Sequence, residues 1–134
     1  MDFVLALHSH LPWVLHHGRW PHGSDWLCEA AMDTYLPLLD VLERLEAERR
    51  PVPLTIGVTP VLANQLAHPD LAAELDAFIA QRLEACEEAA RDFEASGETH
   101  LIPLTQFWRC RLQRLQLVAV SPHAASLAAG EPIK

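Results

Sequence analysis

The chain has 134 residues, half of them hydrophobic (50%), and its 18 acidic side chains outnumber the 10 basic ones, which gives a formal net charge of −8. This acidic balance excludes the basic surface that binding to nucleic acid or to an anionic membrane requires, so neither is expected as a partner. The hydrophobic fraction and the low glycine content exclude a disordered or collagen-like chain, and the length fits one small domain.

Three cysteines, Cys28, Cys86 and Cys110, stand without CxxC spacing. They predict neither a disulfide framework nor a thiolate zinc site, and they favour a reducing, cytoplasmic location. The amino-terminal apolar run is shorter than the roughly 7–15 residues of a signal peptide's apolar region. No run approaches the roughly 18 apolar residues of a membrane span.

The first predicted element is a strand over Phe3 to Leu7, because a continuous apolar run is typical of a strand covered on both faces. His8 to Gly23 has no period and is rich in His, Trp, Gly and Pro, which predicts a long loop of a kind that is often functional. Ser24 or Asp25 is expected to cap the following helix, whose apolar residues recur at helical spacing as far as Leu45.

Pro37 lies inside this helical stretch and allows two structures. It kinks one long helix, or it stands in the first turn of a second helix that Thr34 caps. A second strand is predicted over Val52 to Val58, and Thr59 and Pro60 are expected to start another helix as cap and first helical residue.

Two longer helices follow. Asp70 to Ala95 carries one apolar stripe, with its acidic residues on a solvated face, and Ser96-Gly97 is expected to end it. Leu101 to Val120 predicts a further helix, and residues 121–134 an irregular tail. The order of strand, loop, helix, strand and helices begins an α/β fold but does not complete it. Two parallel strands cannot close into a barrel, and they do not make a sheet with both faces covered.

Histidine and tryptophan concentrate near the amino terminus: five of the eight histidines and three of the four tryptophans lie in the first 26 residues. This cluster follows the carboxyl end of the first predicted strand, where parallel α/β folds build their ligand sites. Indole faces and imidazole hydrogen bonds suit a polyhydroxylated ring compound. The alternative is a surface loop whose tryptophans only anchor it to the core.

His8 and His10 are two residues apart, so on an extended chain both imidazoles point the same way. Such a pair also begins the metal site of several hydrolases, which leaves a metal-dependent hydrolase or deacetylase open. A metal would need further ligands, and His16, His17 and His22 offer nitrogens on the loop. Two histidines satisfied by backbone groups are the remaining alternative.

Several segments together resemble the amino-terminal region of glycoside hydrolase family 57, and in particular its 1,4-α-glucan branching enzymes. The resemblance runs from residue 2 to about residue 117, and its motifs are HSHLPW at 8–13, GRWP at 18–21, Trp26, Glu29-Ala30, TYLPLL at 34–39 and TIGVTPVLANQL at 55–66. It implies that residues 1–120 form the first portion of a catalytic (β/α)7 barrel, incomplete in this chain.

The resemblance also implies a chemistry: retaining transfer of an α-glucan segment through a covalent intermediate to a glucose 6-hydroxyl, which creates an α-1,6 branch. The implied partner is an α-glucan, and no metal or other cofactor is implied. An α-amylase-like or a 4-α-glucanotransferase member of the same family is the alternative.

The family's motifs place five residues of this chain in substrate binding. His8 and His10 match histidines that line the subsite around the scissile bond, and Trp20 and Trp26 match tryptophans of the substrate groove. Trp13 occupies an aromatic position of the first motif and serves either substrate or packing.

Nothing in this sequence matches the two catalytic carboxylates, and neither Asp25 nor Glu29 is assigned their roles. We therefore expect the chain by itself to lack transferase activity. A truncated gene or a shifted reading frame would explain why the two carboxylates have no match. A non-enzymatic alternative is a small helical piece that associates through apolar stripes at Leu38/Leu42 and Phe78/Phe93, which would then be exposed.

Overall fold

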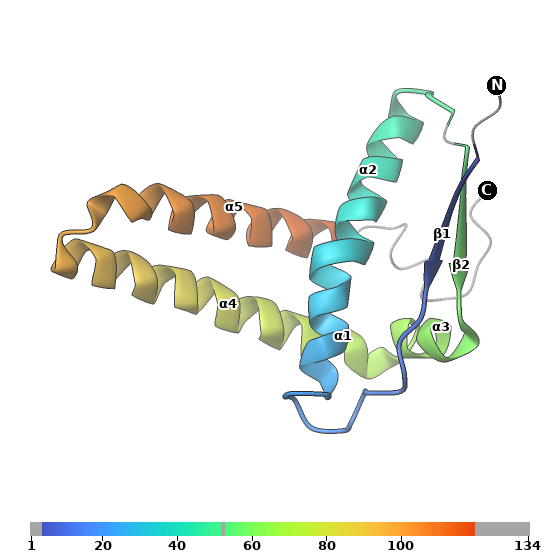
Figure 1. Ribbon diagram of the computed structural model, residues 1–134, viewed down its shortest axis with the longest axis horizontal. Helices are drawn as coiled ribbons and strands as arrows, with labels where there is room; N and C mark the ends of the chain where they lie inside the picture. The colour runs from blue at the N-terminus through green and yellow to red at the C-terminus, as the bar shows by residue number, and fades with distance from the viewer. Residues whose placement is uncertain (1–3, 52, 120–134) are drawn as a thin grey trace.

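Two parallel strands and a series of helices make up the fold (Figure 1). The computed structural model describes residues 4–51 and 53–119. In chain order the elements are β1 (Leu5–Ser9), α1 (Ser24–Ala30), the π-helical turn η1 (Ala31–Tyr35), α2 (Leu36–Ala47), β2 (Leu54–Val58), α3 (Pro60–Leu66), α4 (Pro69–Ser96), the 3₁₀ turn η2 (Thr99–Leu101) and α5 (Ile102–Ala119). The architecture is mixed α/β and rich in helix, as the sequence predicted.

The strand β1 lies two residues further along the chain than predicted, so it takes in His8 and Ser9. Each residue of β1 has a parallel partner in β2, from Leu5 opposite Leu54 to Ser9 opposite Val58. Strand pairing therefore continues past the apolar run, because ladder hydrogen bonds join backbone groups whatever the side chain is. The predicted strand positions at Phe3 and Val52 lie outside the described residues.

The prediction that both faces of the first strand are covered is wrong for the part of the chain that the structure describes. Leu5 and Leu7 of β1 are 42% and 38% exposed, and Ile56 of β2 is 42% exposed. A two-stranded sheet has an edge at each strand, and the described helices pack chiefly on one another. Apolar strands of this kind need further layers to bury them.

The helices α1 and α2 form one continuous column through η1 (Figure 1). Pro37 stands in the first turn of α2 by numbering, but Tyr35 before it keeps helical backbone angles. A proline lacks an N–H and its ring clashes with the carbonyl four residues earlier; the wider π-helical turn accommodates both. Of the two predicted structures, one long interrupted helix is present, and the prediction that Thr34 caps a second helix is wrong.

The start of this column also differs from prediction. Gly23, not Ser24 or Asp25, is the N-cap of α1, and no side chain caps the helix. The Ser24 hydroxyl instead donates to Glu74 of α4, at 2.9 Å between Oγ and Oε2. The Ser24 side chain, predicted to cap the helix, therefore makes a tertiary hydrogen bond instead.

The remaining helices begin and end close to the predicted residues. Thr59 and Pro60 start α3 as cap and first helical residue. His68 caps α4, its Nδ1 accepting the N–H of Asp70, and Gly97 ends the helix in the left-handed region at φ 79°. Glycine suits this position because it adopts positive φ without steric cost. The predicted tail over residues 121–134 lies outside the described residues.

The core forms where the helical column crosses the α4–α5 hairpin and where the loop before α1 meets α3 (Figure 1). Leu11, Val14 and Leu15 of this loop are buried, so the loop is partly core. Phe78 is also buried, and Leu38, Leu42 and Phe93 are half-buried, so the two stripes expected to be exposed are largely covered in this structure. None of the described helices has the length and apolar character of a membrane-crossing segment.

Candidate functional site

His8 and His10 lie together at the carboxyl end of β1. Their ring centroids are 5.6 Å apart and the ring planes are inclined by 27°, so the imidazoles stack on one side of the chain. Both side chains are exposed. The predicted common direction of the two rings is therefore present.

The intervening residue shows which face of the sheet the histidines occupy. The Ser9 hydroxyl hydrogen-bonds to the Tyr35 hydroxyl in η1, with 2.7 Å between the oxygens. Ser9 thus points toward the helical column. Because successive side chains of a strand alternate between faces, His8 and His10 point to the face away from these helices.

Gly57 of β2 makes room for His8. The two residues are partners in the parallel register. A Cβ atom built at Gly57 would lie 3.1 Å from Nδ1 of His8, a distance at which one of the two groups must move. Gly57 was not predicted from the sequence, although a glycine within a β-branched run is a recognisable signal for a close approach.

The strand ends are fixed by contacts that the sequence did not predict. The Thr59 N–H donates to the Ser9 carbonyl at 3.2 Å, which continues the pairing beyond β2. The Thr59 hydroxyl is buried without a hydrogen-bond partner among the described residues. Backbone pairing therefore continues one residue past β2, at the end of the sheet that carries the histidine pair.

Gln65, a fully buried residue of α3, holds the loop that follows β1. Its Oε1 accepts the N–H groups of Val14 and Leu15, at 2.7 and 3.2 Å, and its Nε2 donates to the Pro12 carbonyl at 2.9 Å. One amide thus satisfies three backbone groups of a loop without secondary structure. The position of Gln65 on the apolar side of α3 was the available signal.

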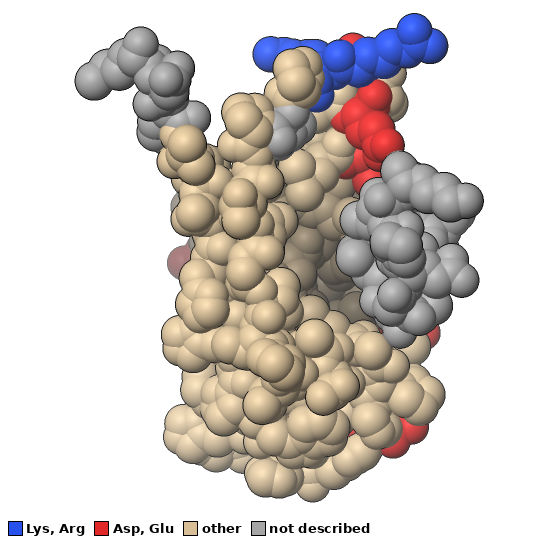
Figure 2. All heavy atoms as spheres, turned by 90° about the vertical axis from the view of Figure 1, so that its right-hand side faces the viewer, with Lys and Arg blue, Asp and Glu red and all other residues tan. Residues whose placement is uncertain are grey.

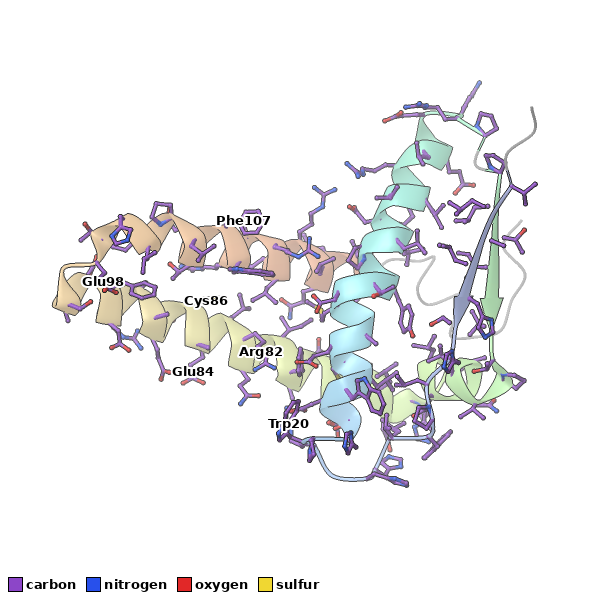
Figure 3. The ribbon with its side chains drawn as sticks, viewed as in Figure 1. Trp20, Arg82, Glu84, Cys86, Glu98 and Phe107 are labelled. Atoms are coloured by element: carbon purple, nitrogen blue, oxygen red, sulfur yellow. The ribbon has the colours of Figure 1, made fainter. Side chains whose placement is uncertain are left out.

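The three predicted tryptophans lie along the same loop and helix start, apart from the histidine pair. Trp13 contacts His68 edge-on, with 6.1 Å between ring centroids, and Trp26 contacts His22 at 5.6 Å. Trp20 is 74% exposed at the foot of α1 (Figure 3). No ring contact within the described residues joins any of them to His8 or His10, so the structure brings together two of the five predicted residues.

The acidic residues near the loop have structural partners. Asp25 accepts from Arg19 at 2.9 Å, and Glu29 pairs with Arg82 at 3.6 Å. Among the described residues, no third metal-ligating group completes a set with His8 and His10. A metal site at this pair, as in a hydrolase or deacetylase, therefore finds no support in the geometry.

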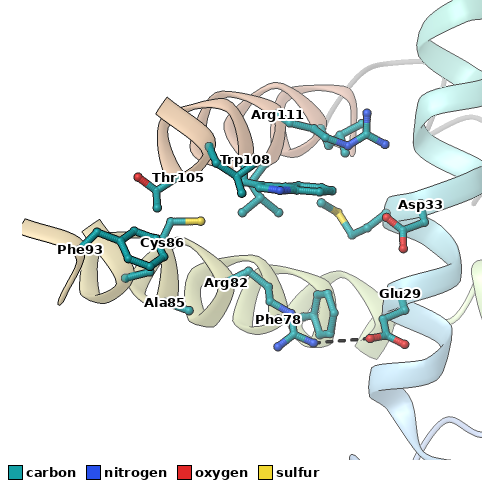
Figure 4. A pocket seen from close by; sticks show the side chains of 15 residues that line it. Glu29, Asp33, Phe78, Arg82, Ala85, Cys86, Phe93, Thr105, Trp108 and Arg111 are labelled. Atoms are coloured by element: carbon teal, nitrogen blue, oxygen red, sulfur yellow. Dashed lines mark ion pairs between the residues drawn. The ribbon is translucent and has the colours of Figure 1, made fainter. Parts of the chain in front are cut away.

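A separate pocket of about 450 Å³ opens between α4, α5 and the helical column (Figure 4). The Arg82 guanidinium lies 4.5 Å from the centroid of the Phe78 ring and pairs with Glu29 at its rim. Trp108 and Cys86 face each other across it (Figure 4). None of the residues assigned by the sequence to substrate binding lines this pocket.

The surface on the β2 side carries few charged side chains: most of the atoms on this face in Figure 2 are tan, the colour of residues other than Lys, Arg, Asp and Glu. This contrasts with a chain whose formal net charge is −8. Charged side chains gather instead at the upper rim and lower edge of this view (Figure 2). A neutral face of this kind is suited to burial or to uncharged ligands.

Comparisons with known proteins bear on this geometry. The chain is 46% identical over 88 residues to a probable 1,4-α-glucan branching enzyme of Mycobacterium tuberculosis, a match that covers 66% of this chain and 17% of the relative. It is 42% identical over 85 residues to a 1,4-α-glucan branching enzyme of Thermococcus kodakarensis, covering 63% of this chain and 13% of that protein. No family model matches the chain.

The fold is similar to the crystal structure of a GH57-type branching enzyme from Pyrococcus horikoshii, with a TM-score of 0.82 and 31% identity. That match covers 90% of this chain and 22% of the solved chain. The resemblance to glycoside hydrolase family 57 branching enzymes is thus confirmed in sequence and in structure. The matched segments span 13–17% of the length of the curated relatives.

Proposed function

We propose that this chain is the amino-terminal part of a 1,4-α-glucan branching enzyme and supplies one wall of its glucan site. In this proposal residues 1–120 form the opening portion of a (β/α)7 barrel, with β1 and β2 as its first two strands. The observation that carries the proposal is the position of His8 and His10: at the carboxyl end of a parallel strand, on the face away from the helices.

That position is the one where barrel enzymes bind substrate. In a β/α barrel the helices cover the outer face of the sheet, and the loops at the carboxyl ends of the strands form the active site. The surface on the β2 side, which carries few charged side chains (Figure 2), would suit a sugar, which has hydroxyl groups but no charge. His8 and His10 would donate to and accept from these hydroxyls, and Gly57 would keep the His8 ring in place.

The tryptophans would extend this wall along the loop. Indole rings stack on the C–H faces of sugars, and exposed Trp20 has a free face for such stacking. Trp13 and Trp26 are half-exposed and contact histidines, so each would present one edge to a glucan and use the other for packing. The catalytic carboxylates of the retaining mechanism are assigned to no residue of this chain.

Glucan binding is testable on the chain itself. We expect maltoheptaose to shift the NMR signals of the His8 and His10 rings and of the tryptophan indole N–H groups, with an affinity of about 1 mM because one wall alone is present. His10→Ala should weaken binding severalfold, whereas His100→Ala, an exposed histidine in η2, should not. Equal shifts with β-linked cellohexaose, or none with maltoheptaose, would contradict the proposal.

Branching activity is tested in a chimera. The matched 85-residue segment of the Thermococcus kodakarensis enzyme is replaced by the corresponding segment of this chain. The chimera should convert amylose into a product from which isoamylase releases new short chains, and His10→Ala in the same chimera should abolish this release. A folded chimera that only raises the number of reducing ends would indicate hydrolysis instead, and a folded but inactive one would overturn the assignment.

A cytoplasmic location stays a prediction. It is supported by the three cysteines, all of which are free thiols in the structure.

A further inference from the structure

A second cluster of potential ligands lies apart from the histidine pair, where the loop after β1 meets the start of α4. Nε2 of His16 is 2.8 Å from Oδ2 of Asp70, and Nδ1 of His68 is 3.8 Å from the same oxygen. One ligand atom from each of the three residues lies within 4.8 Å of the others. We propose that His16, His68 and Asp70 form a zinc site, independent of the proposed glucan function.

The distances fit a tetrahedral ion after small side-chain rotations. With zinc–nitrogen and zinc–oxygen bonds of about 2.0–2.2 Å, neighbouring ligand atoms in a tetrahedron lie about 3.3–3.6 Å apart. The two separations from Asp70 Oδ2, 2.8 and 3.8 Å, lie on either side of this range. The Asp70 oxygen now bonded to His16 would instead share the ion with both imidazoles. Nδ1 of His68 would release the Asp70 N–H, which it now accepts at 3.2 Å, and use the same lone pair for the ion.

The donor set selects the class of metal. Two imidazole nitrogens and one carboxylate are typical ligands of zinc and other first-row divalent ions, whereas magnesium and calcium prefer oxygen alone. Three protein ligands leave a fourth tetrahedral position for water. The side chains of His16 and Asp70 are about half exposed, so an ion can reach the site from solvent.

The backbone holds the three ligands in place before any ion binds. His16 adopts a positive φ of 69° inside a turn closed by the His17 N–H donating to the Val14 carbonyl at 3.1 Å. Gln65 holds that turn through the N–H groups of Val14 and Leu15, and its own carbonyl accepts the His68 N–H at 3.1 Å. Both ligand-bearing segments are therefore fixed to the same residue, which limits the entropy lost on binding.

One electrostatic factor opposes the ion. The cluster lies at the amino-terminal end of α4, where the helix dipole favours anions. The Asp70 carboxylate in the first turn offsets this field locally. We therefore expect a moderate affinity rather than the tight binding of a closed structural site with four protein ligands. A bound ion would also fix the His68 ring, against which Trp13 packs.

The test is a zinc titration of the full chain against a chromophoric chelator, in a Cys110→Ser background that removes the exposed thiol. His16→Asn and His68→Asn remove one ligand each but suit their backbones, because asparagine tolerates positive φ and is a good N-cap. His17→Asn is the matched control, an exposed neighbour outside the cluster. Circular dichroism without zinc verifies that every variant is folded.

We expect one equivalent of zinc to bind, an affinity loss of at least about tenfold in His16→Asn and His68→Asn, and no loss in His17→Asn. Zinc should also raise the melting temperature of the parent chain but not of the two ligand variants. If His16→Asn misfolds, His16→Gly replaces it, because glycine adopts the same backbone without strain. Absence of zinc binding, or equal binding by all variants, would overturn the proposal.

Discussion

Gly57 has no side chain, and this leaves room for the imidazole of His8, a candidate glucan-binding residue. A methyl group there would lie 3.1 Å from Nδ1 of His8. Gly57→Ala is therefore expected to displace the imidazole and weaken maltoheptaose binding severalfold. The fold should stay at least as stable, because alanine restricts the unfolded chain more than glycine does. NMR titration and thermal melting measure the two effects separately.

Thr55→Ala is the matched control for this substitution. Thr55 lies two residues before Gly57, on the same face of β2, and it pairs with Ala6 rather than with His8. Its truncation to alanine removes atoms and adds none. It should leave maltoheptaose binding unchanged. Reduced stability together with unchanged binding in Gly57→Ala would show that His8 does not need this space.

The three thiols should differ in reactivity. Burial raises the pKa of the Cys28 thiol to about 12, with the nearby carboxylates of Glu74 and Asp25 acting in the same direction. Only the thiolate reacts, so a raised pKa keeps Cys28 unreactive at pH 8. Exposed Cys110 should react first with a disulfide reagent, and Cys28 only after unfolding.

The assay counts thiols with time in native buffer and again in denaturant, and Cys110→Ser should remove the fastest phase. Rapid modification of Cys28 in the folded chain would show that this part of the core opens readily.

At the scale of elements, the loop between β1 and α1 depends on α3 for its shape. Gln65→Leu keeps the volume of the side chain but leaves two N–H groups and one carbonyl without their partner. The expected loss in free energy of unfolding is about 2–4 kcal/mol, measured by urea denaturation. Gln113→Leu on the exposed side of α5 should change it by less than about 0.5 kcal/mol.

Gln65→Leu should also affect the proposed zinc site. Because Gln65 fixes the loop that carries Trp13 and His16, Gln65→Leu should also weaken zinc binding. Unchanged stability together with unchanged zinc binding would show that this amide does not organise the loop.

The elements also show where local sequence was sufficient. The ends of α4 were predictable because Pro69 and Gly97 act on their own backbone, through a fixed φ and a left-handed cap. The start of α1 was not, because the Ser24 hydroxyl bonds to Glu74, fifty residues later in the chain.

At the scale of the whole molecule, the sheet is the least covered part of the described structure. The face that carries Leu5, Leu7 and Ile56 is largely apolar and exposed, and parallel strands are normally buried. The chain is therefore expected to associate as its concentration rises, which light scattering during size-exclusion chromatography would measure. Ile56→Thr should reduce association while preserving the strand, because threonine also favours extended structure.

Val61→Thr on α3 is the control, since Val61 is about as exposed as Ile56 but lies outside the sheet. A sharp monomeric profile at all concentrations would show that the chain is stable without further cover of its strands.

Local patterns along the chain predicted the two strands, most helix ends and the common direction of His8 and His10, because these follow from periodicity and from the alternation of side chains on a strand. The motifs also indicated the resemblance to family 57 branching enzymes. Three contacts are visible in the folded chain alone: Gly57 makes room for His8, Gln65 holds the loop, and His16 meets His68 and Asp70. These contacts join residues about 50 positions apart, and no local pattern encodes which distant backbone will pack beside a given side chain.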